Sequence, residues 1–494
     1  MTDRAIRRVL LILLGLGVLL LIASLPGQRI HGDEAAFAEF AWFQSQDGYV
    51  HTELFRGLLE YETRVLLYHK LFIWLGAGMV SLFGYGIWPL RALSLLSTLA
   101  LALLPWRFVR GQDSGTRTLT VLAAMTFVLL APLTFKFAKF YRPEMMQAVT
   151  GLALYFALER GVRDDRMALY VLAGFAAGTS VLMHLNGVVY VIAGATVLLL
   201  RRRWKGTLAY GAAAAIAVSP FFFEIIGRFD LFWLQYNFDP TFGENERTVA
   251  GTLLKLVEEH KRLFRSPEII FSTVLFITAL IANVRSEGWR RRDFHVLTFA
   301  SMVALGALAP AKTTPYAILL FPFWAIEVGH WIGRLPVTWR STPALFRSAC
   351  GIVIAAFVVH SLVADSVNAL SDKQDWIGEN TRALAVVPEG ARILGPLDLV
   401  LDELPDRQIA GLRLAEWRIH DWGQKPYTLQ TLTAYADSAG CAALVLDREL
   451  WRRFGLSGTP ETPPANGYRL VYSDPDGNRF VFVNGEKRES GPGD

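Results

Sequence analysis

The sequence predicts a polytopic α-helical membrane protein that ends in a small extracytoplasmic α/β domain. Hydrophobic residues make up 53% of the 494 residues, and the mean hydropathy is +0.33. These residues are gathered in blocks of about 16–21, the length at which a helix crosses a bilayer. Arginine clusters separate many of the blocks, and from about residue 367 the composition becomes that of a soluble domain. Together, these observations indicate about eleven transmembrane helices followed by one small domain.

The first apolar block, residues 8–25, follows three arginines, and no clear small-residue cleavage site comes after it. A signal peptide has a shorter apolar region and such a cleavage site, so we interpret 8–25 as a retained span with its N-terminus in the cytoplasm. Ten further candidate spans follow at 87–106, 118–138, 145–159, 167–183, 186–200, 207–225, 268–284, 294–310, 316–333 and 348–365.

The positive charge of the segments between the spans supports this topology. With the N-terminus inside, every cytoplasmic segment contains arginines, among them the runs at 201–203 and 290–292, as the positive-inside rule requires. Residues 65–84 are also apolar enough to span, but counting them would move both arginine runs outside. We therefore interpret 65–84 as an interfacial or re-entrant helix within a first outer loop, 26–86. The protein is then expected in the cytoplasmic (inner) membrane, with its C-terminal domain outside.

Three domains are expected from these patterns. A transmembrane domain covers 1–366, an extracytoplasmic α/β domain covers 367–485, and residues 486–494 form a disordered tail. The net charge of +5 and the pI near 9.1 are compatible with nucleic-acid binding. The basic residues instead lie at span ends, where they set topology, so we expect no nucleic-acid partner.

Five segments indicate the α/β character of the C-terminal domain. The stretches 391–401 (ARILGPLDLVL) and 441–447 (CAALVLD) are typical of buried strands. Residues 468–483 (YRLVYSDPDGNRFVFV) predict a hairpin around a Pro-Asp-Gly turn. Residues 381–390 and 429–440 predict helices that end at glycine.

Asp33 and Glu34 form a carboxylate pair directly after the first span, in the stretch HGDEA. Acids in a hydrated loop are ordinary, so the pair alone does not establish a site. The second outer turn, KFAKFYRPEMMQ, adds Arg142 and Glu144 at the same surface. Charges at a membrane boundary cost free energy unless they face water or one another. The turn is therefore a candidate site, although snorkelling lysines and an Arg–Glu pair would also explain it.

Two further outer turns carry polar side chains. LAPAKTTPYAILLFPFW contains Lys312 and Tyr316, and SVLMHLNGVVY contains His184. Lys312 is a cation on the side that the positive-inside rule disfavours, and it could bind a phosphate or a lipid headgroup. A single histidine between apolar runs is more often structural. Four outer turns thus supply carboxylates and cations to one membrane face. This suits sugar transfer from a lipid phosphate: a carboxylate deprotonates an acceptor hydroxyl, and cations neutralise the departing phosphate.

The order of several short motifs resembles the lipid-phosphosugar-dependent glycosyltransferases of the GT-C fold. This family includes the protein O-mannosyltransferases and the aminoarabinose transferases that act on lipid A. The matching elements, which span roughly residues 5–335, are GDEA at 32–35, SLFG at 81–84, Arg91 in WPLRALS, RPE at 142–144, and Lys312 with Tyr316 and the later Pro322.

The resemblance implies roles for these residues. Asp33 would be the catalytic base or acceptor-positioning acid with Glu34 beside it, and Glu144 would be the second-loop acid. Arg142 and Lys312 would hold the donor phosphate, and the other substrate-binding candidates are Tyr316, His184, His69, Lys70 and Arg91. The family's bacterial branch often has prolines before the interfacial helix, whereas this chain reads TRVLLYHK, which leaves the roles of His69 and Lys70 and the donor sugar open.

The resemblance also implies the partners. The donor would be a polyprenyl-phosphate-linked sugar, the acceptor a lipid, glycan or protein, and the surroundings membrane lipids. Some members of the family use a divalent metal held by outer-loop acids. Asp33, Glu34 and Glu144 could supply such a site, but no ligand spacing establishes it.

Other classes of function stay open. A transporter or flippase would need ionisable groups within the membrane, and the predicted spans contain few. A non-catalytic scaffold would present the C-terminal domain. A polymerase or ligase with a pyrophosphate donor would place its decisive residues in the long outer segment 226–267 rather than at Asp33.

Overall fold

The structure, a computed structural model, describes residues 2–108, 114–239, 249–288, 291–309, 312–339, 342–371, 373, 375–404, 406–454 and 467–485. The predicted tail at 486–494 lies outside these residues. The chain divides into two compact units. The helical unit comprises Met1–Pro26, Leu67–Phe72 and Arg91–Asp372, and the sheet unit comprises Gly27–Leu66, Ile73–Leu90 and Lys373–Asp494. The division falls within helices α3 (Lys70–Phe83) and α4 (Ile87–Leu103).

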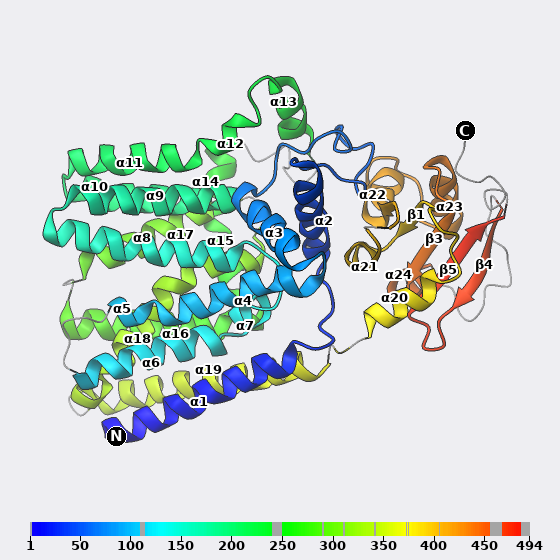
Figure 1. Cartoon of the computed structure of the whole chain (residues 1–494). Coiled ribbons are helices and arrows are strands. Elements are labelled where there is room, and N and C mark those ends of the chain that lie inside the picture. The colour runs from blue at the N-terminus through cyan, green and yellow to red at the C-terminus, as the bar shows by residue number, and fades with distance from the viewer. Residues whose placement is uncertain are drawn as a thin grey trace. The chain divides into compact units, whose positions relative to one another are not determined.

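The helical unit is built from helices that lie side by side along a common direction (Figure 1). Its elements are α1 (Asp3–Ser24), α5 (Pro105–Phe108), α6 (Ser114–Leu130), α7 (Pro132–Phe137), α8 (Glu144–Asp164), α9 (Met167–Met183), η1 (Leu185–Gly187), α10 (Val188–Leu200), α11 (Trp204–Val218), α12 (Pro220–Phe223), α13 (Phe229–Phe238), α14 (Val249–Val257), α15 (Glu259–Phe264), α16 (Pro267–Glu287), α17 (Arg292–Leu308), η3 (Thr314–Leu320), α18 (Phe321–Thr338) and α19 (Ala344–Ser371).

Among the described residues, five helical segments are long and apolar enough to cross a membrane: Asp3–Ser24, Trp204–Phe223, Pro267–Glu287, Thr314–Thr338 and Ala344–Leu370. Shorter apolar helices cover other expected spans, such as Met167–Met183. The total of eleven spans, and the interfacial interpretation of 65–84, stay predictions.

Two expected spans are interrupted by proline. The span 118–138 becomes α6 and α7, and Pro132 is the first residue of α7. The span 207–225 becomes α11 and α12, with Pro220 at the start of α12. Proline has no backbone N–H to bond to the preceding turn, but it fits the first turn of a new helix. Each break therefore falls at the proline.

Helices α9 and α11 approach each other closely through glycine. A Cβ atom at Gly174 would lie 2.1 Å from the carbonyl oxygen of Tyr210, and one at Gly178 would lie 2.3 Å from that of Ala214. These glycines are four residues apart, so they share one face of α9. Small residues at this spacing let two helix backbones pack directly together, as in membrane helix pairs.

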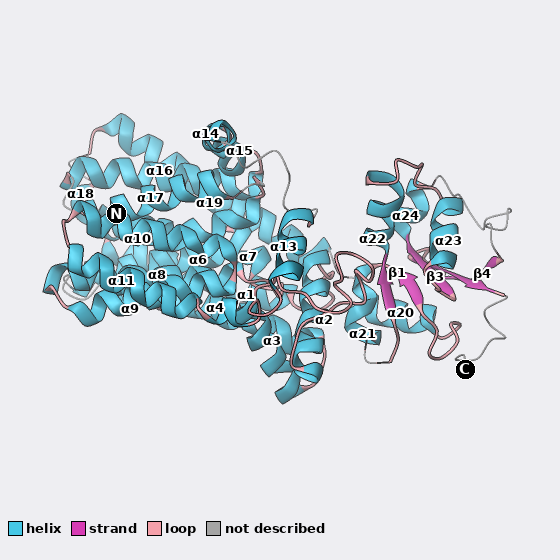
Figure 2. Ribbon diagram, turned by 90° about the horizontal axis from the view of Figure 1, so that it is seen from above, coloured by secondary structure: helices cyan, strands magenta, loops and turns pink. Residues whose placement is uncertain are grey.

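The described residues of the sheet unit form a sheet of five strands, drawn in magenta in Figure 2. The order is β2-β1-β3-β5-β4, with β1 (Ile393–Gly395) parallel to β2 (Ile409–Gly411) and β3 (Ala443–Asp447). The hairpin of β4 (Tyr468–Ser473) and β5 (Arg479–Asn484) pairs antiparallel to β3, which confirms the predicted hairpin. The helices of this unit are α2 (Gly32–Asp47), α20 (Trp376–Leu384), η4 (Leu397–Leu399), α21 (Val400–Glu403), α22 (Leu412–Glu416), η5 (Trp417–Asp421), α23 (Leu429–Ser438) and α24 (Arg448–Arg453).

The predicted strand at 391–401 is wrong beyond Gly395. Pro396 follows β1, and the chain then turns through η4 into α21. Proline cannot donate a hydrogen bond to a neighbouring strand, so pairing in the interior of the sheet stops there. Most of the apolar side chains that the pattern identified are still buried, and Leu399, Val400 and Leu401 after Pro396 are buried from helical turns.

Alternate residues of the central strands face opposite sides of the sheet. Leu444 and Leu446 belong to one buried cluster, whereas Ala443 and Val445 belong to another. The second cluster also includes Leu54, which precedes the strands by more than 300 residues. The Gly411 amide at the edge strand donates to the Leu54 carbonyl at 3.0 Å. The segment around Leu54 is therefore part of the core of the sheet unit, although it is far from the strands in sequence.

Candidate functional site

The carboxylate pair lies at the N-terminus of α2 in the sheet unit. His31 is the residue before the helix, and its Nδ1 accepts the Asp33 amide at 3.2 Å. The Glu34 carboxylate accepts the His31 amide, also at 3.2 Å, which completes a capping box. Glu34 is fully buried, whereas the Asp33 side chain is 56% exposed. Two adjacent acids thus differ in environment: Glu34 holds the helix end, and Asp33 faces solvent.

A third acid on α2, Glu39, is fully buried and organises the loop that follows. Its carboxylate accepts the Glu53 amide at 2.8 Å, the Leu54 amide at 3.1 Å and the Thr52 hydroxyl. Burial raises the pKa of Glu39 to about 8, although these hydrogen bonds oppose the shift. Glu39 thereby fixes residues 52–54, which carry Leu54 into the sheet core.

In the helical unit, Arg142 and Glu144 form a buried ion pair between α7 and α8. The Arg142 Nε lies 3.1 Å and 3.2 Å from the two carboxylate oxygens of Glu144, and one terminal nitrogen lies 2.5 Å from Oε1. Burial alone would raise the pKa of Glu144, but the charge and hydrogen bonds of Arg142 outweigh it and lower that pKa. Glu144 is therefore a carboxylate at neutral pH and offsets the Arg142 charge.

Beside this pair, three rings from separate segments pack together. The His69 and His184 imidazoles stack with centroids 4.0 Å apart, and the Tyr316 ring packs edge-on at 5.5 Å from His184. His184 Nδ1 accepts the Asn186 amide at 3.0 Å and caps η1. Burial and the nearby Arg142 charge lower the pKa of His184 to about 3. His184 is therefore neutral, and it positions a turn and packs against rings rather than supplying charge.

Lys312 belongs to a second charged group at the same end of the helices. Its Nζ lies 3.0 Å from Glu259, and the other Glu259 oxygen accepts from Arg262 at 2.8 Å. The Arg262 side chain is fully buried, donates to the Thr313 carbonyl at 3.1 Å and lies over the Tyr316 ring. Burial lowers the pKa of Lys312 despite the Glu259 carboxylate. Tyr316 thus connects this group to the His184 rings.

The remaining two predicted site residues, Lys70 and Arg91, contact other side chains. The Lys70 ammonium is fully buried and lies 2.8 Å from Glu224, which also accepts the Tyr68 hydroxyl at 2.7 Å. Arg91 is buried, and its guanidinium lies over the Phe140 ring at 5.8 Å. Phe140 lies in the same turn as Arg142, so Arg91 supports that turn from α4.

The helical unit therefore brings together Arg142, Glu144, His69, His184, Tyr316 and Lys312 from four turns. We call this set, with Glu259 and Arg262, the outer cluster. Helices α8 and α15, which carry Glu144, Glu259 and Arg262, are labelled in Figure 1. The outer cluster contains three cations and two carboxylates, so it retains one positive charge when all are ionised. Asp33 and Glu34 belong to the sheet unit.

The expected metal site has no ligand set among the side chains described. Within these residues, no three His, Cys, Asp or Glu side chains lie close enough to hold an ion. Glu34 is engaged in a helix cap and Glu144 in an ion pair with Arg142, so neither presents an uncommitted carboxylate. The described residues do not fit a metal, and no step of the chemistry is assigned to one.

The sequence reasoning missed Glu259, Arg262, Glu224 and Glu39. The signal for the first two is the run EEHKR at 258–262, which concentrates charge within an apolar, aromatic outer segment. Glu224 ends a Pro-Phe-Phe-Phe helix, where an isolated acid next to a predicted span is a candidate partner for a buried cation. Glu39 has no comparable signal, because it alternates with apolar residues along an ordinary helix.

Comparison with known proteins finds one family model that matches part of the chain. The family model described as dolichyl-phosphate-mannose-protein mannosyltransferase matches residues 70–225, which include Lys70, Arg91, Arg142, Glu144 and His184. No curated protein matches the sequence.

Solved structures match almost the whole chain. ArnT from Cupriavidus metallidurans in the apo state matches with a TM-score of 0.64 and 14% identity, over 98% of this chain and 99% of that one. The same protein bound to undecaprenyl phosphate matches with a TM-score of 0.62, 15% identity and the same coverage.

A third match is more distant. The archaeal oligosaccharyltransferase AglB from Archaeoglobus fulgidus, in complex with an inhibitory peptide and a dolichol-phosphate, gives a TM-score of 0.53 and 12% identity. This match covers 98% of this chain and 74% of the AglB chain. At such identities the likeness concerns the fold, and it includes both the helices and the small sheet domain. This chain therefore has the same fold as these solved structures, the GT-C fold, which confirms the fold that its short motifs indicate.

Proposed function

We propose that this protein transfers a sugar from a polyprenyl-phosphate-linked donor to an acceptor hydroxyl at the outer face of the cytoplasmic membrane. The observation that carries the proposal is the outer cluster. Arg142, Arg262 and Lys312 come from turns distant in sequence and are gathered at one end of a GT-C bundle. Its unbalanced positive charge suits a phosphate, and its place at helix ends suits a ligand whose tail stays in the membrane.

Asp33 is the base in this proposal. Its exposed carboxylate removes the proton of the acceptor hydroxyl as the hydroxyl oxygen bonds to the anomeric carbon. The bond from that carbon to the phosphate oxygen breaks, and its electron pair leaves with the polyprenyl phosphate. One displacement of this kind inverts the anomeric centre. The proton on Asp33 is then released to water.

Arg142 and Lys312 stabilise the charge that develops on the leaving phosphate. Both are already paired with carboxylates, so a bound phosphate would compete with Glu144 and Glu259 for their N–H groups. Pairing in the free enzyme keeps these partly buried cations oriented and reduces the cost of holding them in place. His69, His184 and Tyr316 form an aromatic surface beside these cations.

A second candidate is a ligase or polymerase that uses a pyrophosphate-linked donor. It is favoured by Glu259 and Arg262, because both lie in the outer segment 226–267 that such an enzyme would use. The two phosphates of such a donor would bind Arg142 and the Lys312–Arg262 group at the same time. A donor panel that contains monophosphate- and pyrophosphate-linked sugars separates the two candidates directly.

The test is transfer by Asp33→Asn in membranes supplied with radiolabelled polyprenyl-phosphate sugars and endogenous acceptors. Loss of a positioned base typically costs about 10²–10⁴-fold in rate, and we expect that loss without a change in abundance or apparent melting temperature. The matched control is Asp47→Asn, which removes a carboxylate from the other end of α2. Transfer by Asp33→Asn at the wild-type rate would refute the proposal.

A further inference from the structure

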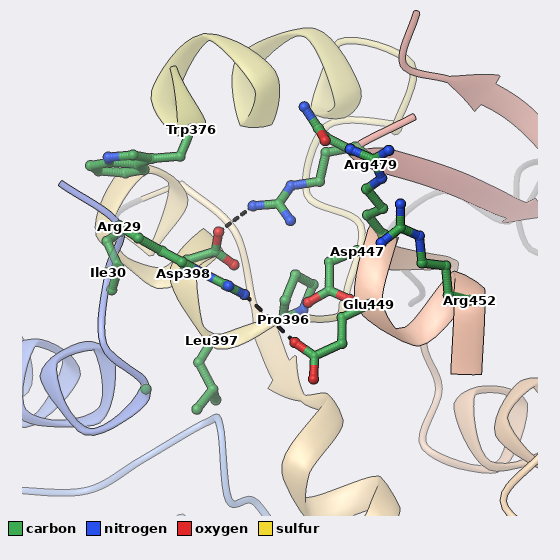
Figure 3. A pocket seen from close by; sticks show the side chains of 13 residues that line it. Arg29, Ile30, Trp376, Pro396, Leu397, Asp398, Asp447, Glu449, Arg452 and Arg479 are labelled. Atoms are coloured by element: carbon green, nitrogen blue, oxygen red, sulfur yellow. Dashed lines mark hydrogen bonds and ion pairs between the residues drawn. The ribbon is translucent and has the colours of Figure 1, made fainter. Parts of the chain in front are cut away.

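The sheet unit contains a cavity of 620 Å³ beside the start of α2 (Figure 3). Five segments line it: the approach to α2, the start of α20, the turn after β1, the start of α24 and the start of β5. Gly32, the residue before Asp33, is part of its wall. The cavity therefore adjoins the helix end that carries the proposed base.

Four arginines and three carboxylates line this cavity: Arg29, Arg448, Arg452, Arg479, Asp398, Asp447 and Glu449. The three carboxylates of the lining contact other groups of the protein. Asp398 pairs with the buried Arg479, and Glu449 lies 3.9 Å from Arg29, as the dashed lines in Figure 3 show. Asp447 accepts the Leu450 amide at 2.8 Å and caps α24.

Arg448 and Arg452 give the lining its excess of positive charge, because the four arginines outnumber the three carboxylates by one. Both are exposed on α24, Arg448 as its first residue and Arg452 in its last turn, and neither forms an ion pair within the described part of the chain. Their spacing of four residues places both on one face of the helix. Guanidinium groups bind phosphates and carboxylates through paired N–H donors. This wall of the cavity is thus suited to an anion.

Trp376 provides the apolar part of the lining. It is the first residue of α20, is 6% exposed, and adjoins the cavity together with Leu397. An aromatic ring next to charged donors suits a saccharide, which presents apolar C–H faces as well as polar edges. A cavity of this volume is also within the range of sites that hold small ligands.

We propose that this cavity binds the anionic portion of the acceptor, a saccharide that carries a phosphate or a carboxylate. Arg448 and Arg452 hold the anion, Trp376 packs against the sugar, and the acceptor hydroxyl extends past Gly32 toward Asp33. This assignment of the acceptor class rests on the proposed transfer function. It gives the C-terminal domain a role in selecting the acceptor.

The first measurement is direct binding to the purified full-length protein by titration calorimetry. The probes are glucose 6-phosphate, glucuronate and glucose, which share a sugar ring and differ in charge. We expect the two anions to bind and glucose to bind far more weakly. The double variant Arg448→Ala/Arg452→Ala should lose at least about tenfold in affinity for the phosphate probe, because it removes charge-assisted hydrogen bonds. If only one of the two anions binds, that result names the acceptor group.

The control variant is Arg469→Ala, which removes an exposed arginine of β4 that does not line the cavity. It should bind the probes as the wild type does. Equal binding of glucose and glucose 6-phosphate would overturn the proposal. So would an equal loss of binding in Arg469→Ala, because the effect would then come from general surface charge.

The second measurement is transfer to acceptor extracts at increasing concentration. Arg448→Ala/Arg452→Ala should raise the KM for acceptor with kcat near the wild-type value, whereas Asp33→Asn should lower kcat and leave binding of glucose 6-phosphate intact. If the double variant loses binding but keeps its KM, the cavity is not an acceptor subsite. If Asp33→Asn transfers normally while the probes still bind, the transfer mechanism fails and the anion site stands by itself.

Discussion

Arg142 and Glu144 share three nitrogen–oxygen contacts of 2.5–3.2 Å in a setting where Glu144 is fully buried and Arg142 nearly so. The two residues are separated by a single proline, so the turn between α7 and α8 fixes their geometry. A cation proposed to bind donor phosphate is thus preorganised by a carboxylate two positions away.

Removing one partner of this pair should destabilise the helical unit strongly. Glu144→Ala leaves a buried guanidinium without its counter-charge, which typically costs about 3–5 kcal/mol. The double variant Arg142→Ala/Glu144→Ala should lose less, because no charge stays uncompensated. The measurement is the apparent melting temperature of each purified variant. A Glu144→Ala protein as stable as the wild type would show that water already solvates Arg142.

The buried Glu39 predicts that the loop at 52–54 loosens as pH rises. Its pKa is raised to about 8 from an ordinary value of 4.5, so the folded state binds this proton more tightly than the unfolded chain. The stabilisation is complete below pH 4.5 and is lost as pH rises from there to about 8. Hydrogen exchange at Glu53 and Leu54, corrected for the intrinsic rate, should accelerate across this window. Glu39→Gln should remove that dependence, and exchange in β5 serves as the internal control.

Lys312 predicts a pH-dependent affinity for the donor. Burial lowers its pKa, so it loses its proton at a lower pH than an exposed lysine does. The KM for donor should therefore rise as alkaline pH approaches that lowered pKa. Lys312→Gln should raise the KM by about tenfold or more at neutral pH and flatten the profile. The control is Lys261→Gln, an exposed lysine that pairs with Glu258. A donor KM unchanged in Lys312→Gln would remove Lys312 from the donor site.

The close approach of α9 to α11 predicts that alanine substitutions at two glycines change the stability by different amounts. Gly178→Ala places a methyl group 2.3 Å from the carbonyl oxygen of Ala214, so the helices must separate, at a cost of about 1–3 kcal/mol. Gly211 lies on α11, where an added Cβ atom would meet no other atom within 4 Å, and Gly211→Ala should be neutral or slightly stabilising. Equal melting temperatures for the two variants would contradict this packing.

Much of the helical architecture follows from hydrophobic blocks, as the match of α9 to the expected span at 167–183 illustrates. The proline breaks at Pro132 and Pro220 could also have been predicted, because their physical cause is local. The hairpin at 468–483 was predictable for the same reason, since alternation and a Pro-Asp-Gly turn act over a few residues.

The partners of charged side chains were not predictable in this way. Lys312 pairs with Glu259 and Lys70 with Glu224 because of how distant turns meet, and the sequence offers several equivalent acids for each. Likewise, the sequence does not show which of the adjacent acids Asp33 and Glu34 is structural. Only the capping geometry at His31 separates a buried structural acid from an exposed one.

The insertion of Leu54 into the sheet core has a consequence for biosynthesis. Arg418 donates to the Gly57 carbonyl across 361 positions, and Tyr85 donates to Val400 across 315. Residues 27–66 are translated before the helices α5–α19 and before the strands that cover them. During synthesis, Leu54 and its apolar neighbours therefore stay exposed, or bound to a chaperone, until the strands that pack on them have been translated. A nascent chain truncated before the last strands should thus be a substrate for quality-control proteases through its first loop rather than through its new C-terminus.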